Sequence, residues 1–331
     1  MRCSKTERFR IALCSILIPF SFMLSGCGGG SSGSQPDYTN IAAYGAVSGK
    51  NFNIVNTRTG LAQTIVNSDV IGAATFVGGG MDVAVVSGSG VINIYNVSTG
   101  AVVGSFNCGY TLNTQGIASS PDGRYIAVAG DSAPDANVVM LWNQQTGMCD
   151  YKFDLGERVK IMAFSPDGKY LAAGGTGGAV KIWNISTDFF VNVGNNTSTI
   201  ETIAFSPDGQ ILATANINEK VRFWKTSDGT RTGSPADISG ASVLFFLPDG
   251  NSIATAGFTG TLHKYRVADG TDEGALGPAV IPYRSSISRD FKTVFIRYDD
   301  KKFRMLDTVT GGVSMSFDAM GTGDQFQDMS W

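Results

Sequence analysis

Residues 163–184 read AFSPDGKYLAAGGTGGAVKIWN, and this stretch decides the fold because the chain repeats it. An apolar run leads into Ser-Pro-Asp-Gly, a second apolar run follows, and a third run ends in Trp-Asn. Proline sets φ at the first corner of a tight turn, aspartate hydrogen-bonds the turn backbone, and glycine accepts the positive φ that closes it. The stretch therefore predicts short antiparallel strands joined by tight turns.

The third run recurs at a near-constant spacing. Its copies lie at 51–60, 91–100, 138–147, 180–187, 221–229, 262–270 and 303–311, most of them ending in Thr-Gly or Asp-Gly. Aligned on Val55, Tyr95, Trp142, Trp183, Trp224, Tyr265 and Leu306, they are 40, 47, 41, 41, 41 and 41 residues apart. Turn motifs that start at Ala118, Ala163, Ala204 and Phe245 interleave with them. Four short strands fit each period, so we predict an all-β, seven-bladed propeller with four antiparallel strands per blade.

The two ends of the chain are expected to complete one blade together. The strands predicted at Ile41–Ala46 and Asn51–Asn56 are the ones that precede the first repeat turn, so that blade lacks a strand. The C-terminal QFQDMSW, Gln325–Trp331, aligns with TIETIAF at Thr199–Phe205, which starts a repeat. We therefore predict that the C-terminal strand joins the N-terminal blade as its innermost strand, which closes the ring and removes two open sheet edges.

Composition agrees with a turn-rich, core-forming chain. Of 331 residues, 42 are glycine, 43% are hydrophobic and only 16% are charged. This excludes a coiled coil, which is rich in charged residues, and bulk disorder, which needs low hydrophobicity. The formal net charge of −3 argues against a nucleic-acid partner, because such proteins carry clustered basic surfaces.

With these motifs, residues 38–331 resemble the WD-repeat propeller superfamily, and in particular its bacterial branch with Ser-Pro-Asp-Gly turns. The chain departs from the family pattern because no repeat has Gly-His or Trp-Asp, and the aspartate expected before the aromatic strand is replaced at Gly177, Gly178 and Asn218. The family's His-Ser-Asp-Trp hydrogen-bond tetrad therefore cannot form. We expect apolar packing between blades to replace it, with the aromatic residues of the third strands as the interblade core: Tyr95, Trp142, Trp183, Trp224 and Tyr265.

The N-terminus resembles a bacterial lipoprotein signal. Four basic residues precede an apolar run at 11–22, and Leu-Ser-Gly-Cys follows at Leu24–Cys27. The run is shorter than the roughly 20 residues of a membrane-spanning helix, so we expect it to be cleaved. The resemblance implies a signal peptide at 1–26 and lipidation of Cys27; cleavage at a nearby small residue, as in an ordinary secretory signal, is the alternative.

A lipidated Cys27 implies a location. Two or three acyl chains hold a protein stably on a membrane leaflet, and the Gly/Ser-rich residues that follow behave as a flexible tether, here assigned to 27–37. Gly28 stands where an aspartate, by resemblance to Gram-negative lipoproteins, would favour retention in the inner membrane. We therefore expect a lipid-anchored protein of the bacterial cell envelope, sorted to the outer membrane if the source is Gram-negative.

Candidate catalytic chemistry is sparse. His263 is the single histidine of the chain, and no cysteine or carboxylate stands at a ligand spacing from it. Asp299 and Asp300 are adjacent carboxylates, but Lys301 and Lys302 follow them, which indicates a solvated turn. We expect no catalytic residue, no metal and no cofactor.

The cysteines and one phenylalanine carry further expectations. Cys108 and Cys149 are predicted to lie toward opposite faces of adjacent blades, beyond the roughly 7 Å Cα separation that a disulfide allows, unless the loop Gly109–Gly116 folds back. In the first strand of each repeat, the position just before the aromatic residue near the turn is small in most copies: Thr75, Ala118, Ala163, Ala204, Ser286 and Ser330. In one copy this position is Phe245. This predicts a narrow central channel with one bulky intrusion.

The resemblance implies that the loops entering each inner strand gather at the channel mouth and engage peptides or proteins. These loops are 108–115, 156–160, 192–199, 235–240, 277–284 and 319–324. Tyr110, Arg158, Tyr283 and Arg284 are their candidate partner-binding residues, because interaction hot spots favour tyrosine and arginine. We expect a monomeric, non-catalytic binding or scaffold module for an envelope protein or peptide. The alternative is a lactonase-like or quinone- or metal-dependent propeller enzyme acting on a small molecule.

Overall fold

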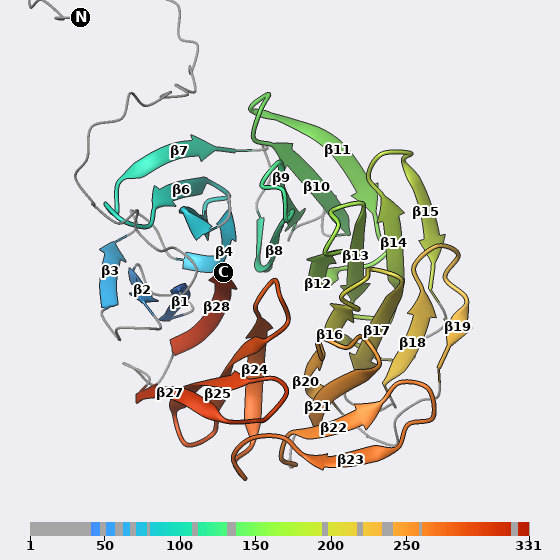
Figure 1. The fold of residues 1–331 in the computed structure, drawn as a ribbon. Coiled ribbons are helices and arrows are strands. Elements are labelled where there is room, and N and C mark those ends of the chain that lie inside the picture. The colour runs from blue at the N-terminus through green and yellow to red at the C-terminus, as the bar shows by residue number, and fades with distance from the viewer. Residues whose placement is uncertain are drawn as a thin grey trace, which may run out of the picture. The chain divides into compact units, whose positions relative to one another are not determined.

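The computed structural model describes residues 41–46, 51–56, 62–66, 71–77, 80–107, 112–130, 137–193, 198–216, 221–233, 241–257, 260–318 and 324–330. These residues form seven four-stranded sheets in which every strand pairing is antiparallel. In Figure 1 the sheets follow one another around a common centre, and each runs from an inner to an outer strand. An all-β propeller with four antiparallel strands per blade is thus confirmed.

We number the sheets 1 to 7 along the chain and give their strands from the inside outward. Sheet 1 contains β28 (Asp324–Ser330), β1 (Ile41–Ala46), β2 (Asn51–Asn56) and β3 (Ala62–Val66). Sheet 2 contains β4 (Ile71–Val77), β5 (Asp82–Ser87), β6 (Ile92–Asn96) and β7 (Val102–Phe106). Sheet 3 contains β8 (Leu112–Ser119), β9 (Tyr125–Gly130), β10 (Val138–Asn143) and β11 (Met148–Asp154).

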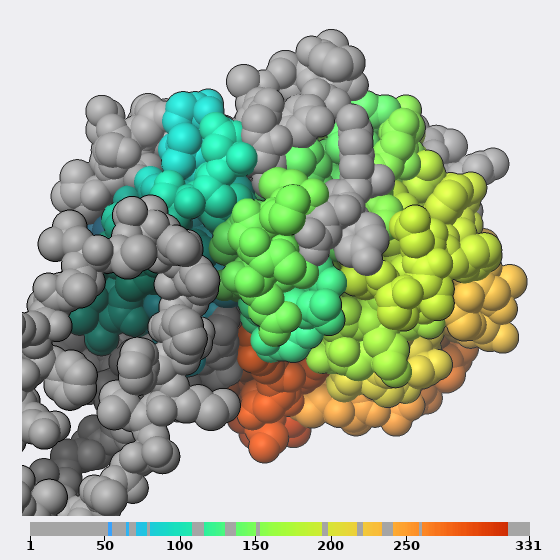
Figure 2. All heavy atoms as spheres, turned by 90° about the horizontal axis from the view of Figure 1, so that it is seen from above, coloured from blue at the N-terminus to red at the C-terminus, as the bar shows by residue number. Residues whose placement is uncertain are grey.

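The remaining sheets repeat this order. Sheet 4 contains β12 (Val159–Phe164), β13 (Tyr170–Gly175), β14 (Val180–Asn184) and β15 (Phe189–Asn192). Sheet 5 contains β16 (Ile200–Phe205), β17 (Ile211–Asn216), β18 (Arg222–Lys225) and β19 (Arg231–Thr232). Sheet 6 contains β20 (Ala241–Phe246), β21 (Ser252–Gly257), β22 (His263–Arg266) and β23 (Asp272–Ala275), and sheet 7 contains β24 (Pro282–Ile287), β25 (Thr293–Tyr298), β26 (Lys302–Asp307) and β27 (Val313–Asp318). In the space-filling view, teal, green, yellow and orange parts of the described chain lie next to one another (Figure 2).

The Ser-Pro-Asp-Gly turns are held by a serine as well as by the aspartate. In sheet 4 the Ser165 hydroxyl donates to Asp167 Oδ1 (2.6 Å) and accepts from the backbone N–H of Tyr170 (2.9 Å). Asp167 Oδ1 also accepts from the N–H of Lys169 at 3.1 Å. The same contacts occur in sheets 3, 5 and 7, around Ser120, Ser206 and Ser288. From the sequence, proline, aspartate and glycine were expected to form these turns, and the role of the serine was not predicted.

Aromatic packing between successive sheets forms the core. Trp183 of sheet 4 lies 4.8 Å from Phe153 of sheet 3, and Trp142 of sheet 3 stacks on Phe106 of sheet 2 at 3.7 Å. Tyr95 meets Phe52 edge to face at 5.6 Å. Tyr95, Trp142, Trp183 and Trp224 are all buried, which confirms them as interblade core, whereas Tyr265 is half-buried.

Two side chains show how the tetrad is replaced. The indole N–H of Trp224 donates to Thr214 on the adjacent strand (2.9 Å), whereas the indole N–H of Trp142 has no hydrogen-bond partner among the residues that the structure describes. Both rings are nevertheless buried. These two positions therefore share the burial of the ring and do not share a hydrogen bond.

Cys149 is disulfide-bonded, although the positions expected for Cys108 and Cys149 disfavoured a bond between them. Every other cysteine of the chain, Cys108 included, lies outside the described residues. The pairing of β10 with β11 shifts register between Leu141 and Trp142, directly at the Trp142–Cys149 pair. Such a bulge changes the direction of neighbouring side chains, so strand position alone does not predict whether this thiol can form a disulfide.

The predicted signal peptide, Cys27 and the tether also lie outside the described residues, so their assignment stays a prediction. Among the residues that are described, no helix is long and apolar enough to cross a membrane.

The Thr-Gly turns give a direct test of backbone strain. Gly147 has φ of +70°, and a Cβ placed on it would meet no atom within 4 Å. Gly147→Ala should therefore destabilise the protein through the left-handed backbone alone, by about 1 kcal/mol. Urea unfolding measures this change. Gly104→Ala is the control, because Gly104 lies in β7 without a positive φ and its Cβ would make an ordinary contact with Ile94; equal losses for both variants would contradict the argument.

Candidate functional site

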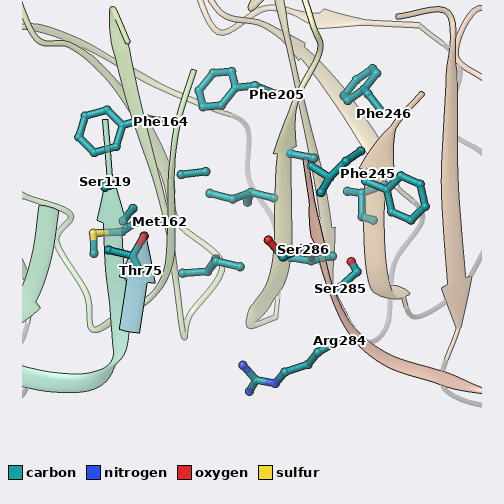
Figure 3. A pocket seen from close by; sticks show the side chains of 18 of the residues that line it. Thr75, Ser119, Met162, Phe164, Phe205, Phe245, Phe246, Arg284, Ser285 and Ser286 are labelled. Carbon is teal, nitrogen blue, oxygen red and sulfur yellow. The ribbon is translucent and has the colours of Figure 1, made fainter. Parts of the chain in front are cut away.

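The inner strands surround a central cavity of about 600 Å³. Residues of β4, β8, β12, β16, β20 and β24 line it (Figure 3). Each of these strands is the terminal strand of its sheet, so in the described topology one backbone edge has no strand partner. Unpaired N–H and C=O groups make such an edge a polar surface that can pair with an added peptide segment.

A β-bulge recurs near the start of five inner strands, and in one of them, β4, the skipped residue is Gly72, which is not among the residues that line the cavity. The register of β12 with β13 skips Lys160, and the equivalent pairings of β16, β20 and β24 skip Glu201, Ser242 and Tyr283. These four residues are each 41 positions apart and all line the cavity. Since they hold the same register position, they lie at the same end of the cavity. We call these four residues the bulge ring.

Arg284 is the residue directly after Tyr283, and it places a positive charge next to the bulge ring. Its side chain extends from β24 into the space between the cavity walls (Figure 3). Desolvation by those walls has the largest influence and lowers the pKa of Arg284. The nearby Glu201 carboxylate opposes this lowering, and the positive charge of Arg297 adds to it.

The structure brings together two of the four predicted partner-binding residues. Tyr283, which is 44% exposed, and Arg284 both line the cavity. Arg158 is exposed in the loop before β12 but is not among the lining residues, and Tyr110 lies outside the described residues. Sequence reasoning missed Lys160, Glu201 and Ser242, although their spacing of 41 from one another and from Tyr283 was a signal that could have found them.

The loop that carries Arg158 is anchored by its neighbour. Glu157 Oε1 accepts hydrogen bonds from the backbone N–H groups of Gly177 (2.9 Å) and Ala179 (2.8 Å) in the β13–β14 turn. A Cβ on Gly177 would overlap this carboxylate. In this sheet a glutamate from the preceding loop thus binds the turn in which the family pattern expects an aspartate.

The prediction of a bulky intrusion at Phe245 is wrong. The residue is on the lining strand, but its side chain is only 2% exposed and belongs to the apolar cluster between sheets 6 and 7, with Val294 and Tyr298. Ser285 and Ser286 stand on the adjacent inner strand β24. Small residues there leave room for a large ring from β20, so the repeat accommodates Phe245 by packing it between the sheets.

The other candidate chemical groups lie away from the cavity. His263 Nδ1 is 2.9 Å from an Asp272 carboxylate oxygen across β22 and β23. Asp300 sits in the β25–β26 turn and pairs with Arg304, where Arg304 Nη1 donates to Asp300 Oδ1 at 3.0 Å. Asp299 is exposed in the same turn. Within the described ranges, no group of three or more histidine, cysteine, aspartate or glutamate side chains could hold a metal ion.

Glu157 gives a prediction for the loop at the channel mouth. Glu157→Ala should destabilise the protein by about 1–3 kcal/mol, because two backbone donors lose a charged acceptor. Thermal unfolding measures the loss, and hydrogen exchange at Gly177 and Ala179 localises it. Glu157→Gln keeps an acceptor oxygen and should lose less; an alanine variant as stable as the wild type would refute the anchoring role.

The chain resembles known proteins in its repeat and in its fold. Residues 152–184 and 190–225 match the family described as WD domain, G-beta repeat, and these segments contain β12–β14 and β16–β18. No curated protein matches the chain. The crystal structure of the computationally designed Ika8 protein is similar, with a TM-score of 0.67 and 19% identity over 88% of this chain and 87% of that one. At this identity the likeness shows the fold alone, and together with the two repeat matches it supports a WD-repeat propeller.

Proposed function

We propose that the protein is a lipid-anchored, non-catalytic binding module of the bacterial cell envelope, and that it holds a segment of a partner protein at the bulge ring. A WD-repeat propeller is consistent with a protein-interaction scaffold. The observation that carries the proposal is the recurrence of Lys160, Glu201, Ser242 and Tyr283 at one position of successive inner strands. The repeat thereby gathers two charges, a hydroxyl and an exposed aromatic ring around one opening.

The chemistry of this opening suits a peptide. Free backbone edges can hydrogen-bond an extended segment, and Tyr283 offers an aromatic contact of the kind that interaction hot spots use. The described lining residues include no histidine or cysteine and a single carboxylate, Glu201. Binding therefore explains the lining better than nucleophilic or general acid–base catalysis does.

The envelope location rests on the N-terminus and is supported by one side chain of the fold. Leu24–Cys27 has the form of a lipobox, and Cys27 would carry the acyl chains that hold the protein on the outer membrane. The disulfide at Cys149 supports the same compartment, because structural disulfides persist in oxidising environments such as the periplasm.

We further propose that the seven sheets close into one monomeric seven-bladed ring. The pairing of β28 with β1, which includes Ile41–Ser330 and Ala46–Asp324, supports this closure. It joins the last strand of the chain to the first and gives sheet 1 the same number of strands as the other sheets. A closed ring would hold the bulge ring at a fixed diameter.

Removing Gln325–Trp331 tests the closure. The truncated protein should lose the β1–β28 hydrogen bonds, and we expect its melting temperature to fall by about 10 °C or more. Differential scanning calorimetry measures this, and deletion of Trp331 alone is the control that retains all of β28. An unchanged melting temperature for the longer deletion would eliminate this mode of closure.

Crosslinking in cells tests the proposed function. A photoreactive residue at Tyr283 or Arg158 should capture one defined envelope protein, whereas the same residue at Phe189 should not, because Phe189 is 64% exposed on an outer strand away from the cavity. Mass spectrometry identifies what is captured. Capture should disappear in a Cys27→Ala form if the anchor is required. Equal capture at Phe189, or none at the channel mouth, would reject a protein partner at this end.

A further inference from the structure

In sheet 7, one position of the repeat is occupied by residues of a different kind from those at the equivalent position of sheets 4, 5 and 6. The residue after the bulge pairs with a residue on the second strand: Ile161 with Gly174, Thr202 with Ala215, and Val243 with Ala256. In sheet 7 the equivalent pair is Arg284 with Arg297, again 41 residues further along in both strands. A pair of neutral residues, one of which is glycine or alanine, is thus replaced in sheet 7 by a pair of arginines.

This replacement is unfavourable for the fold. Directly opposed residues of an antiparallel pair project from the same face with Cβ atoms about 5 Å apart, and like charges at that distance repel each other. Neither guanidinium has a hydrogen bond or ion pair within the described part of the chain, and Arg297 Nε is buried without a partner. Arg297 Cζ lies 6.0 Å from the centroid of the Tyr283 ring. A position that breaks the repeat rule at a cost in stability is where a functional contact is expected.

The surrounding charges favour an anion. The residues that line the cavity include Lys160, Arg284 and Arg289 but one acid, Glu201, although the chain as a whole has a net charge of −3. Guanidinium groups match carboxylate and phosphate oxygens through paired N–H donors. Glu201 acts on Arg284 electrostatically. Its negative charge disfavours a dianionic phosphate more than a monoanionic carboxylate.

We propose that Arg284 and Arg297 together bind a carboxylate group of the peptide segment held at the bulge ring. This inference rests on the proposed function and specifies its ligand as an acidic segment. Tyr283 lies beside both arginines and would pack against the same segment. The carboxylate could belong to an aspartate or glutamate side chain or to a chain terminus, which the experiment below separates.

The test uses the full-length protein purified in detergent and a fluorescein-labelled hexaglutamate peptide with an amidated C-terminus. Fluorescence anisotropy should show binding that unlabelled hexaglutamate displaces and hexaglutamine does not. Arg284→Gln and Arg297→Gln should each weaken binding by about tenfold or more. Arg231→Gln is the matched control, because Arg231 is exposed on the outer strand β19 and carries the same charge.

A second readout separates binding from structure. Each glutamine substitution at the pair removes a like-charge repulsion, so the melting temperature should stay the same or rise while binding falls. A structural role would instead lower the melting temperature. Displacement of the labelled peptide by a neutral peptide with a free C-terminus, more strongly than by its amidated form, would assign the site to a terminal carboxylate.

The outcomes distinguish this inference from the proposed function. If hexaglutamate does not bind, or binds all variants equally, the carboxylate site is rejected, and crosslinking at Tyr283 still decides whether a protein partner exists. If inorganic phosphate displaces the peptide better than hexaglutamate does, the ligand class is overturned. If hexaglutamate binds through the two arginines but crosslinking captures nothing, the carboxylate site stands and the protein partner is rejected.

Discussion

Face-to-face packing between successive sheets is the interaction on which the rest of this structure depends. In sheets 2 to 5 the aromatic residue of the third strand is buried against the preceding sheet, as Trp183 is against Phe153. Burial of such rings contributes a large apolar area and favourable ring geometry. This contact does not depend on a hydrogen bond, so the fold tolerates the absence of a hydrogen-bond tetrad. It also tolerates the Trp142 indole, which has no hydrogen-bond partner in the described part of the chain.

The same packing explains why the centre of the propeller is available for binding. Much of the apolar surface is used between sheets, and the innermost strands present backbone edges and a mixture of polar and apolar side chains to the cavity. In four of these strands a bulge adds one cavity-lining residue per repeat without disturbing the core, since the bulged residue leaves the pairing of its neighbours intact on either side. Variation at that position changes the opening and leaves the scaffold unaltered.

Sheet 7 shows how far such variation goes. In the other sheets with this bulge the following pair is neutral, and in sheet 7 it is Arg284 with Arg297. The scaffold can carry two opposed cations because the sheet is held by apolar contacts elsewhere, among them those of Val294 and Ile296 with sheet 6. Stability supplied by the blade interface thus permits an unfavourable pair at the candidate site.

The sequence by itself determined the repeat, its strands and its turns, because a period near 41 and Ser-Pro-Asp-Gly depend on local backbone chemistry. It also identified the aromatic core and two residues of the cavity, Tyr283 and Arg284. The tertiary structure decided what depends on pairing across strands and sheets. The bulges at Lys160, Glu201 and Ser242, the disulfide at Cys149, the burial of Phe245 and the pairing of Arg284 with Arg297 follow from register and neighbouring sheets, which no local pattern encodes.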